Sequence, residues 1–142
     1  MHKYTRGEFA QAFLKELNVP VTKNTMRVLL AWQQAEGDAG RFNPLNTTED
    51  WPGATIFNGV GVKNYRSFDD GVKATVRTLN YGADRNLYGY HRIRAALRRN
   101  ERPWHALKAV EESSWGTGGL ALRVLRSVPV LAEIFRHHRL SQ

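Results

Sequence analysis

Helical spacing of the apolar residues constrains the fold of this chain more than any other sequence feature. Apolar side chains recur every three or four positions along most of the 142 residues, which places one apolar stripe on each of several amphipathic helices. The pattern predicts a mostly α, compact single domain that spans residues 1–142. The expected helices begin near residues 5, 24, 68, 89, 103, 119 and 129.

The stretch 37–66 interrupts this pattern with a high density of Gly, Pro, Asn and Thr. Within it, Asn58-Gly59 lies between two short β-prone runs, and this dipeptide is typical of hairpin turns. We therefore expect a small hairpin or shaped loop, inserted after the second helix. Local signals also mark three helix starts: a capping box at Thr5 and Glu8, a cap at Ser67 and a first-turn proline at Pro103.

The amino-acid composition excludes several kinds of functional site. The chain has no cysteine, which excludes disulfides and thiolate metal sites, and its five His residues show no metal-ligand spacing. We therefore expect no metal and no cofactor. No stretch approaches the roughly 18 apolar residues of a membrane span, and the first residues lack a signal-peptide pattern. The formal net charge of +8 attracts polyanions such as nucleic acid, anionic lipid or an anionic cell-wall polymer.

Glu36 is an acid at the end of an apolar stripe. Leu29, Trp32 and Glu36 fall at i, i+3 and i+7, so the carboxyl group extends the apolar face of the second expected helix, which Gly37 ends. Burial and the negative end of the helix dipole both disfavour the charged form and raise the pKa of such a carboxyl. A carboxyl kept protonated near neutral pH suits a general acid, for example in glycoside cleavage. The alternative is an ordinary solvated glutamate at a helix end.

Glu36 also lies in the first of five segments whose order and spacing resemble one protein family. They are AWQQAEG (31–37), FNPLNTT (42–48), FNGVGVKNY (57–65), SFDDGVKAT (67–75) and SSWGTGG (113–119). Together they resemble the peptidoglycan-cleaving domains of the lysozyme-like superfamily in bacteriophage endolysins and tail-associated lysins, which include muramidases, glucosaminidases and lytic transglycosylases. The resemblance implies a compact lysozyme-like helical fold with Glu36 as the catalytic acid.

The resemblance further implies a substrate-binding loop and groove beside Glu36. Asn and Thr side chains suit acetamido and hydroxyl groups, and tyrosine rings can stack on sugar faces. The structural alternatives are that the Asn and Thr residues only form turns and that Tyr65 is core. Trp32 is expected in the core, and Trp115 as a structural plug. The residues matched to substrate binding are Asn43, Asn46, Thr47, Thr48, Gly61, Asn64, Tyr65, Tyr88 and Tyr90.

The second catalytic carboxylate is harder to assign. Glycoside hydrolysis normally uses two acids, and we expect Asp50, or its neighbour Glu49, in this role because both lie on the insertion. A lytic transglycosylase of this superfamily needs one Glu alone, so both routes stay open. Glu112, before Trp115, is a rival for Glu36, but the segments after it lack a Gly-x-x-Tyr loop.

Three functions fit these observations, and cleavage of peptidoglycan glycan strands by a muramidase or lytic transglycosylase is favoured. The enzyme would be a phage lysin held in the host cytoplasm before release to the cell wall, or a virion-associated module. The second function is an inactive wall-binding or tail-structural module of the same fold, and the third is a basic nucleic-acid-binding protein.

The expected partner is bacterial peptidoglycan, with no membrane and no nucleic acid, and the chain is expected to act as a monomer or as part of a larger lysin. An arginine-rich face is expected to hold the anionic wall by salt-sensitive attraction. Its residues are Arg92, Arg94, Arg98, Arg99, Arg102, Arg123, Arg126, Arg136 and Arg139.

Overall fold

The computed structural model describes residues 3–127, which form six α-helices and one hairpin of two short strands. This confirms the prediction of a mostly α domain with a small hairpin after the second helix. The helix expected at 129–139 lies outside the described residues. In chain order the elements are α1 (Arg6–Glu16), α2 (Lys23–Glu36), β1 (Thr55–Ile56), β2 (Lys63–Asn64), α3 (Phe68–Asp84), α4 (Tyr90–Arg98), α5 (Pro103–Glu112) and α6 (Leu120–Leu125).

Local capping sets the starts of the helices. Thr5 and Glu8 form the predicted capping box at α1, each side chain bonded to the other residue's backbone N–H. The Ser67 hydroxyl accepts a hydrogen bond from the backbone N–H of Asp70 at the start of α3, and Pro103 occupies the first turn of α5. These three predicted helix starts are confirmed.

The hairpin is confirmed, but its turn is wider than the Asn58-Gly59 dipeptide alone indicates. The two antiparallel strands pair Thr55 with Asn64, and residues 57–62 connect them. The Asn58 side-chain oxygen accepts hydrogen bonds from the backbone N–H groups of Val60 and Val62, at 3.2 and 3.1 Å. The asparagine thus organises a longer loop through its side chain instead of closing a two-residue turn.

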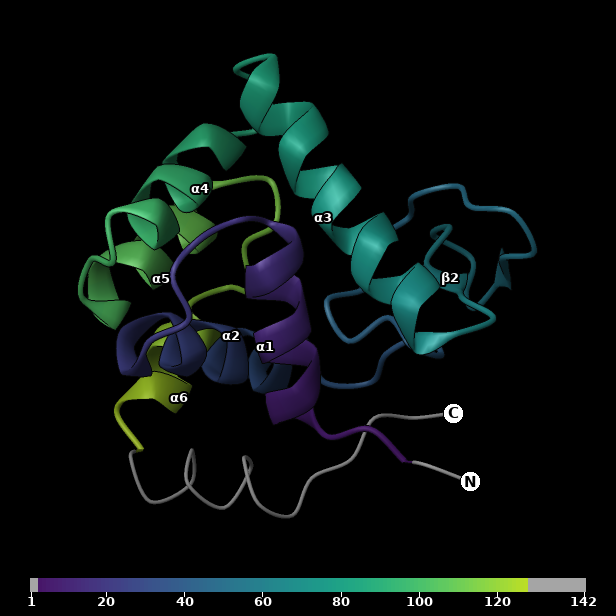
Figure 1. Ribbon diagram of the computed structural model, residues 1–142, viewed down its shortest axis with the longest axis horizontal. Helices are drawn as coiled ribbons and strands as arrows, with labels where there is room; N and C mark the ends of the chain where they lie inside the picture. Colours follow the sequence, from purple (N-terminus) through teal and green to yellow (C-terminus); the bar gives the residue numbers. More distant parts are fainter. Residues whose placement is uncertain (1–2, 128–142) are drawn as a thin grey trace.

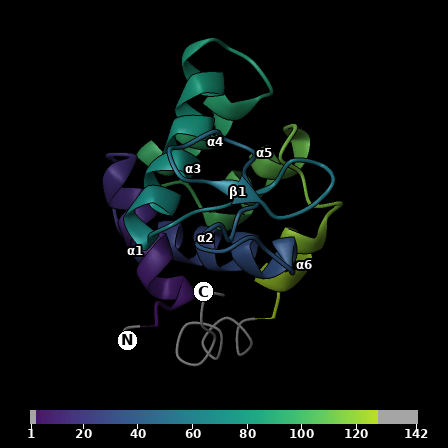
Figure 2. The ribbon, with the colours of Figure 1, turned by 90° about the vertical axis from the view of Figure 1, so that its right-hand side faces the viewer.

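The helices surround α2, which packs against α1, α5 and α6, while α3 packs against α1 and α4. Figure 1 shows the hairpin region on one side of α3 and the helices α4 and α5 on the other. In Figure 2 the hairpin faces the viewer, in front of α2 and α3. The insertion therefore lies beside the C-terminal end of α2, where Glu36 is placed. Between residues 3 and 127, no helix combines the length and apolar character needed to cross a membrane.

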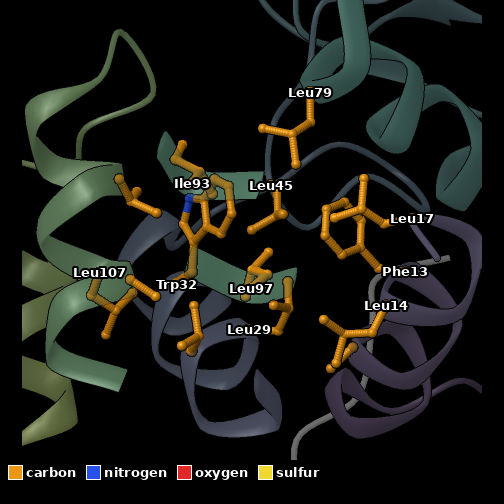
Figure 3. Close-up of a cluster of buried hydrophobic side chains, with 14 of the residues drawn as sticks. Phe13, Leu14, Leu17, Leu29, Trp32, Leu45, Leu79, Ile93, Leu97 and Leu107 are labelled. Atoms are coloured by element: carbon orange, nitrogen blue, oxygen red, sulfur yellow. The ribbon is translucent and has the colours of Figure 1, made fainter. Parts of the chain in front are cut away.

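One hydrophobic cluster draws side chains from all six helices. Trp32 is fully buried in it, as predicted, with Ile93 and Leu107 around its indole (Figure 3). Leu45, from the insertion, reaches the same cluster and is also fully buried. Its backbone carbonyl accepts a hydrogen bond of 2.8 Å from the indole N–H of Trp115. The irregular stretch is therefore anchored in the core, which fixes its position relative to α2.

A second contact holds the insertion to α3. The backbone of Gly71 approaches Phe42 so closely that an added Cβ would lie 1.8 Å from the Phe42 carbonyl oxygen. Phe42, Tyr65 and Ala74 form a small buried cluster at the same place. A glycine is required here because no side chain fits between the helix and the loop.

Candidate functional site

Glu36 is the last residue of α2, and the helix ends directly after it. Gly37 has φ 69° and ψ −129°, a conformation that suits glycine and turns the chain away from the helix axis. Trp32, one turn earlier on the same face, is fully buried, and the Glu36 side chain is partly buried. The predicted continuation of the apolar face into an acid is therefore what the structure shows.

Asn46 connects the insertion to this carboxyl group. Its side-chain amide donates to Glu36 Oε2 at 3.5 Å and to the backbone carbonyl of Asp38 at 3.1 Å. Its side-chain oxygen accepts from the backbone N–H of Gly40 at 3.2 Å. Asn46 itself has a left-handed backbone, with φ 56°. One asparagine thus fixes the loop 37–46 across the end of α2 and contacts the acid directly.

Burial raises the pKa of Glu36 to about 7, from an ordinary value of 4.5. The nearby charge of Glu111 acts in the same direction, whereas the hydrogen bond from Asn46 and the nearby indole N–H of Trp32 favour the charged form and lower the pKa. Desolvation outweighs these opposing effects. At neutral pH a large fraction of Glu36 is therefore protonated, as the sequence predicted from the helix position.

The indole N–H of Trp32 is the second donor near this carboxyl. Its nitrogen is buried and makes no hydrogen bond of normal geometry among the described residues. A donor in this state is unusual because buried polar groups are nearly always paired. It is therefore ready to bond to the Glu36 carboxyl if that group becomes charged or shifts slightly.

A pocket of about 180 Å³ lies next to the Glu36 carboxyl, although Glu36 is not itself one of its lining residues. Asn46 lines it and also touches the Glu36 carboxyl. Burial, the neighbouring Tyr88 and the charge of Glu36 raise the pKa of Tyr90, another lining residue, so the Glu36 carboxyl lies close enough to Tyr90 to affect its ionisation. The lining is polar and aromatic, and its residues are Asn46, Thr47, Thr48, Thr78, Tyr90, Ser114 and Trp115.

The structure thus brings together four of the predicted substrate-binding residues, namely Asn46, Thr47, Thr48 and Tyr90. Thr78 and Ser114 were missed. Thr78 faces the pocket from α3, where its hydroxyl pairs with that of Thr47. Ser114 belongs to the SSWGTGG segment, but nothing in that segment singles out the serine. A threonine within the apolar pattern of α3 is the signal that could have found Thr78.

Trp115 has two roles in the structure. It is 8% exposed, stacks edge-on against Trp32 and bonds to the Leu45 carbonyl, which makes it the structural plug that the sequence predicted. It also lines the pocket and contacts the ring of Tyr90, with ring centroids 5.3 Å apart. The plug therefore forms one wall of the site.

Asn43 and Asn64 lie behind the pocket as structural residues. Asn43 is fully buried, and its amide donates to the carbonyls of Thr47 and Lys63 at 2.8 and 2.9 Å. The Asn64 side chain accepts from the backbone N–H of Arg41 at 2.8 Å. Both asparagines tie the loop 40–48 to the hairpin, which matches the structural alternative of turn formation.

Tyr65 also faces inward. Its ring is 1% exposed and its hydroxyl donates to the Glu49 carbonyl at 2.7 Å. The ring has no free face for a sugar, so the core alternative describes it. Tyr88, by contrast, is 51% exposed and lies against Tyr90, while Gly61 lies next to Thr48 on the outer side of the loop.

The structure does not bring Asp50 to Glu36. Asp50 forms an ion pair of 3.2 Å with Lys63, and its side chain is 96% exposed. Glu49 lies nearer the pocket, because its carboxylate accepts a hydrogen bond from the Thr78 hydroxyl at 3.3 Å and pairs with Arg77 at 3.5 Å. Neither carboxylate lines the pocket.

Glu111, rather than Glu112, is the acid of α5 that affects the site. Its carboxylate accepts hydrogen bonds from the backbone N–H and the hydroxyl of Thr117. Its charge contributes to the raised pKa of Glu36. Glu112 is exposed at the end of the same helix. Glu111 is thus a neighbour of the site whose carboxylate is already bonded, and Glu112, the rival acid, is not one of the described residues that line the pocket.

Within residues 3–127 no group of three or more His, Cys, Asp or Glu side chains is arranged to hold a metal ion. Comparison of the chain with known protein families, with characterised proteins and with solved structures finds no match. The chemistry of the site therefore follows from its own residues.

Proposed function

We propose that this chain cleaves the glycan strands of bacterial peptidoglycan, with Glu36 as the general acid. The observation that carries the proposal is a partly buried carboxyl at a helix end, with a pKa of about 7, beside a polar and aromatic pocket. The resemblance of the five sequence segments to lysozyme-like domains gives the substrate class. We further propose a lysin or a virion-associated module as the setting for this activity.

In the first step, Glu36 donates its proton to the glycosidic oxygen as the bond from that oxygen to the sugar carbon breaks. Desolvation keeps much of Glu36 protonated at neutral pH, so the proton is present for the transfer. The carboxylate that remains is stabilised by the Asn46 amide and by the free indole N–H of Trp32. Both donors stabilise the charged carboxylate, which is the form that Glu36 takes after it has given up its proton.

The second step is proposed to use the same residue. Among residues 3–127 no acidic side chain lines the pocket, which supports a route that needs no second carboxylate. In the single-acid route, Glu36 takes the proton of a muramyl 6-hydroxyl while that oxygen bonds to the sugar carbon and closes an anhydro ring. Glu36 is protonated again at the end, and no water is consumed. This arrangement favours the transglycosylase over the hydrolase.

The test is digestion of purified peptidoglycan, followed by mass spectrometry of the fragments. Wild-type protein should release anhydro-muramyl ends, and Glu36→Gln should release none, because the amide keeps the shape but has no acidic proton. Glu112→Gln is the matched control, since it removes the same charge from an exposed position and should behave as wild type. Reducing ends in place of anhydro ends would refute the single-acid route and restore the two-acid hydrolase.

An inactive wall-binding module is the alternative, and the same digestion separates it from the enzyme. If neither wild type nor Glu36→Gln releases fragments while both sediment with walls, the binding module is correct. If the protein neither cleaves nor sediments with walls but shifts DNA or RNA in a gel at moderate salt, the nucleic-acid-binding hypothesis replaces both.

A further inference from the structure

A second pocket, of about 320 Å³, lies between α4 and α5, and the proposed cleavage does not use it. Ala95, Ala96 and Ala109 form its floor, and charged or polar side chains form its rim. The lining residues are His91, Arg92, Ala95, Ala96, Arg99, Glu101, His105 and Ala109. Successive turns of α4 supply residues 91, 95 and 99 because positions four apart share one face of a helix.

Within residues 3–127, the two arginines of this pocket are not engaged by other side chains, unlike two of the basic residues nearby. The guanidinium groups of Arg92 and Arg99 make no ion pair and no side-chain hydrogen bond within the described part of the chain. In contrast, Arg94 on the same helix pairs with Asp84 at 2.7 Å. Lys108, on α5, lies over the ring of Trp104. The guanidinium groups of Arg92 and Arg99 are therefore available to a ligand at the pocket.

Glu101 is the one acid that lines the pocket in the described part of the chain, and it does not neutralise this charge. Glu101 Oε1 lies 3.8 Å from the Nδ1 of His105, which is too long for a hydrogen bond and is an ion pair only when the imidazole is protonated. Against it stand two permanent guanidinium charges, and the imidazoles of His91 and His105 can supply further N–H donors. The pocket therefore offers several donors converging on one small space, with a net positive charge.

We infer that this pocket binds the phosphate group of a phosphodiester-linked polyol, the chemistry of an anionic cell-wall polymer. A guanidinium group can donate two parallel hydrogen bonds to the oxygens of one phosphate group. A carboxylate has only two oxygens, so it can accept from fewer of the donors in this pocket. The volume exceeds by about tenfold the ~30 Å³ share of one water, so a phosphate fits together with the small groups beside it. The alanine floor leaves that space open.

The lining favours a polyol phosphate over nucleic acid. Single-stranded nucleic acids bind where basic grooves also carry aromatic rings for base stacking. No Phe, Tyr or Trp among residues 3–127 lines this pocket, and the exposed Trp104 lies against His105 outside it. The phosphate site does not depend on the proposed cleavage because it is a separate pocket, whereas the choice of a cell-wall polyol rests on the proposed function. The two pockets meet only in α4, where Tyr90 faces the Glu36 pocket and His91 faces this one.

The first experiment is an NMR titration of the full chain with glycerol 3-phosphate, inorganic phosphate and acetate at constant ionic strength. Both phosphates should shift the resonances of His91, Ala95, Ala96 and His105, whereas acetate should not. Shifts scattered over other basic residues, or equal shifts with acetate, would overturn the site. This measurement needs no variant, so a folding defect cannot obscure it.

The second experiment compares two double variants for binding to poly(glycerol phosphate). Arg92→Gln/Arg99→Gln should weaken binding on the order of tenfold to a hundredfold, as expected for losing two charged hydrogen-bond donors. Arg98→Gln/Arg102→Gln removes the same charge from residues that are exposed like Arg92 and Arg99 but do not line the pocket, and should change binding less than about threefold. Thermal unfolding checks that both variants are folded.

An equal loss in both double variants would show general attraction to a basic surface and refute the pocket. Tighter binding of an oligonucleotide than of poly(glycerol phosphate) at the same salt would replace the polyol with nucleic acid. Neither result depends on glycan cleavage. A failure of the phosphate site is therefore distinguishable from a failure of the function proposed for Glu36, and Glu36→Gln should bind the polymer as wild type does.

Discussion

Replacing Glu36 with glutamine should make the protein more stable at high pH, although it removes the proposed catalytic acid. The pKa of Glu36 is raised from 4.5 to about 7 by burial, so the folded protein holds this proton more tightly than the unfolded chain does. Below 4.5 both states are protonated and the group has no pH-dependent effect. As the pH rises through this interval the unfolded state loses its proton first, which favours unfolding.

The size of the effect follows from the two pKa values. Each pKa unit corresponds to about 1.4 kcal/mol, so the interval from 4.5 to about 7 corresponds to a loss of about 3 kcal/mol in the free energy of unfolding above pH 7. Glutamine does not titrate and keeps an oxygen that can accept the hydrogen bond from Asn46. The variant should therefore avoid this loss, while wild type and variant differ little at about pH 4.

Urea unfolding of both proteins across this pH range measures the difference directly, because the titration of all other groups cancels. Glu112→Gln is the control, since the same substitution at an exposed position should give a difference that is nearly flat with pH. A flat difference for Glu36→Gln, or one that favours wild type at high pH, would show that the carboxyl is not desolvated. The reasoning about a general acid would then fail as well.

Three further predictions test the site and the loop that forms it. Wall cleavage, followed by the fall in turbidity of a wall suspension, should decrease as the pH rises through about 7, because the protonated fraction of Glu36 falls. Activity that still increases well above that pH would contradict this. Asn43→Ala should lower the free energy of unfolding by about 2–4 kcal/mol in urea, because it leaves buried backbone groups such as the Thr47 carbonyl unpaired; a loss under about 1 kcal/mol would contradict it. Gly71→Ala should lower the melting temperature by at least about 5 °C, since its Cβ would overlap the Phe42 carbonyl, and an unchanged melting temperature would show that the loop can move aside.

Three local features show how much of the fold could be predicted from the sequence. The capping box at Thr5, the first-turn proline at Pro103 and the apolar stripe that leads to Glu36 act between residues within a turn or two of each other. Local patterns of this kind fix helix starts and ends directly. Placement of an acid at the end of an apolar helix, and the direction of its pKa, could therefore be predicted.

The sequence did not predict which polar residues of the insertion face the pocket and which face the interior. Asn43 and Asn46 lie in the same short motif, yet Asn43 turns inward and holds the hairpin while Asn46 contacts Glu36. Tyr65 and Tyr90 are both tyrosines of the predicted groove, but only Tyr90 lines the pocket. In irregular backbone no periodicity tells the inner face from the outer, so residue type alone leaves both readings open.

The sequence by itself determined the helices, the hairpin and the identity of the candidate acid, because these depend on neighbours along the chain. Only the tertiary structure decided that a pocket exists beside that acid. Its walls come from the insertion, α3, α4 and the segment after α5, and Trp115 locks them together through the carbonyl of Leu45, 70 positions away. The desolvation that raises the pKa of Glu36 arises from this assembly, since it depends on how much water distant segments exclude.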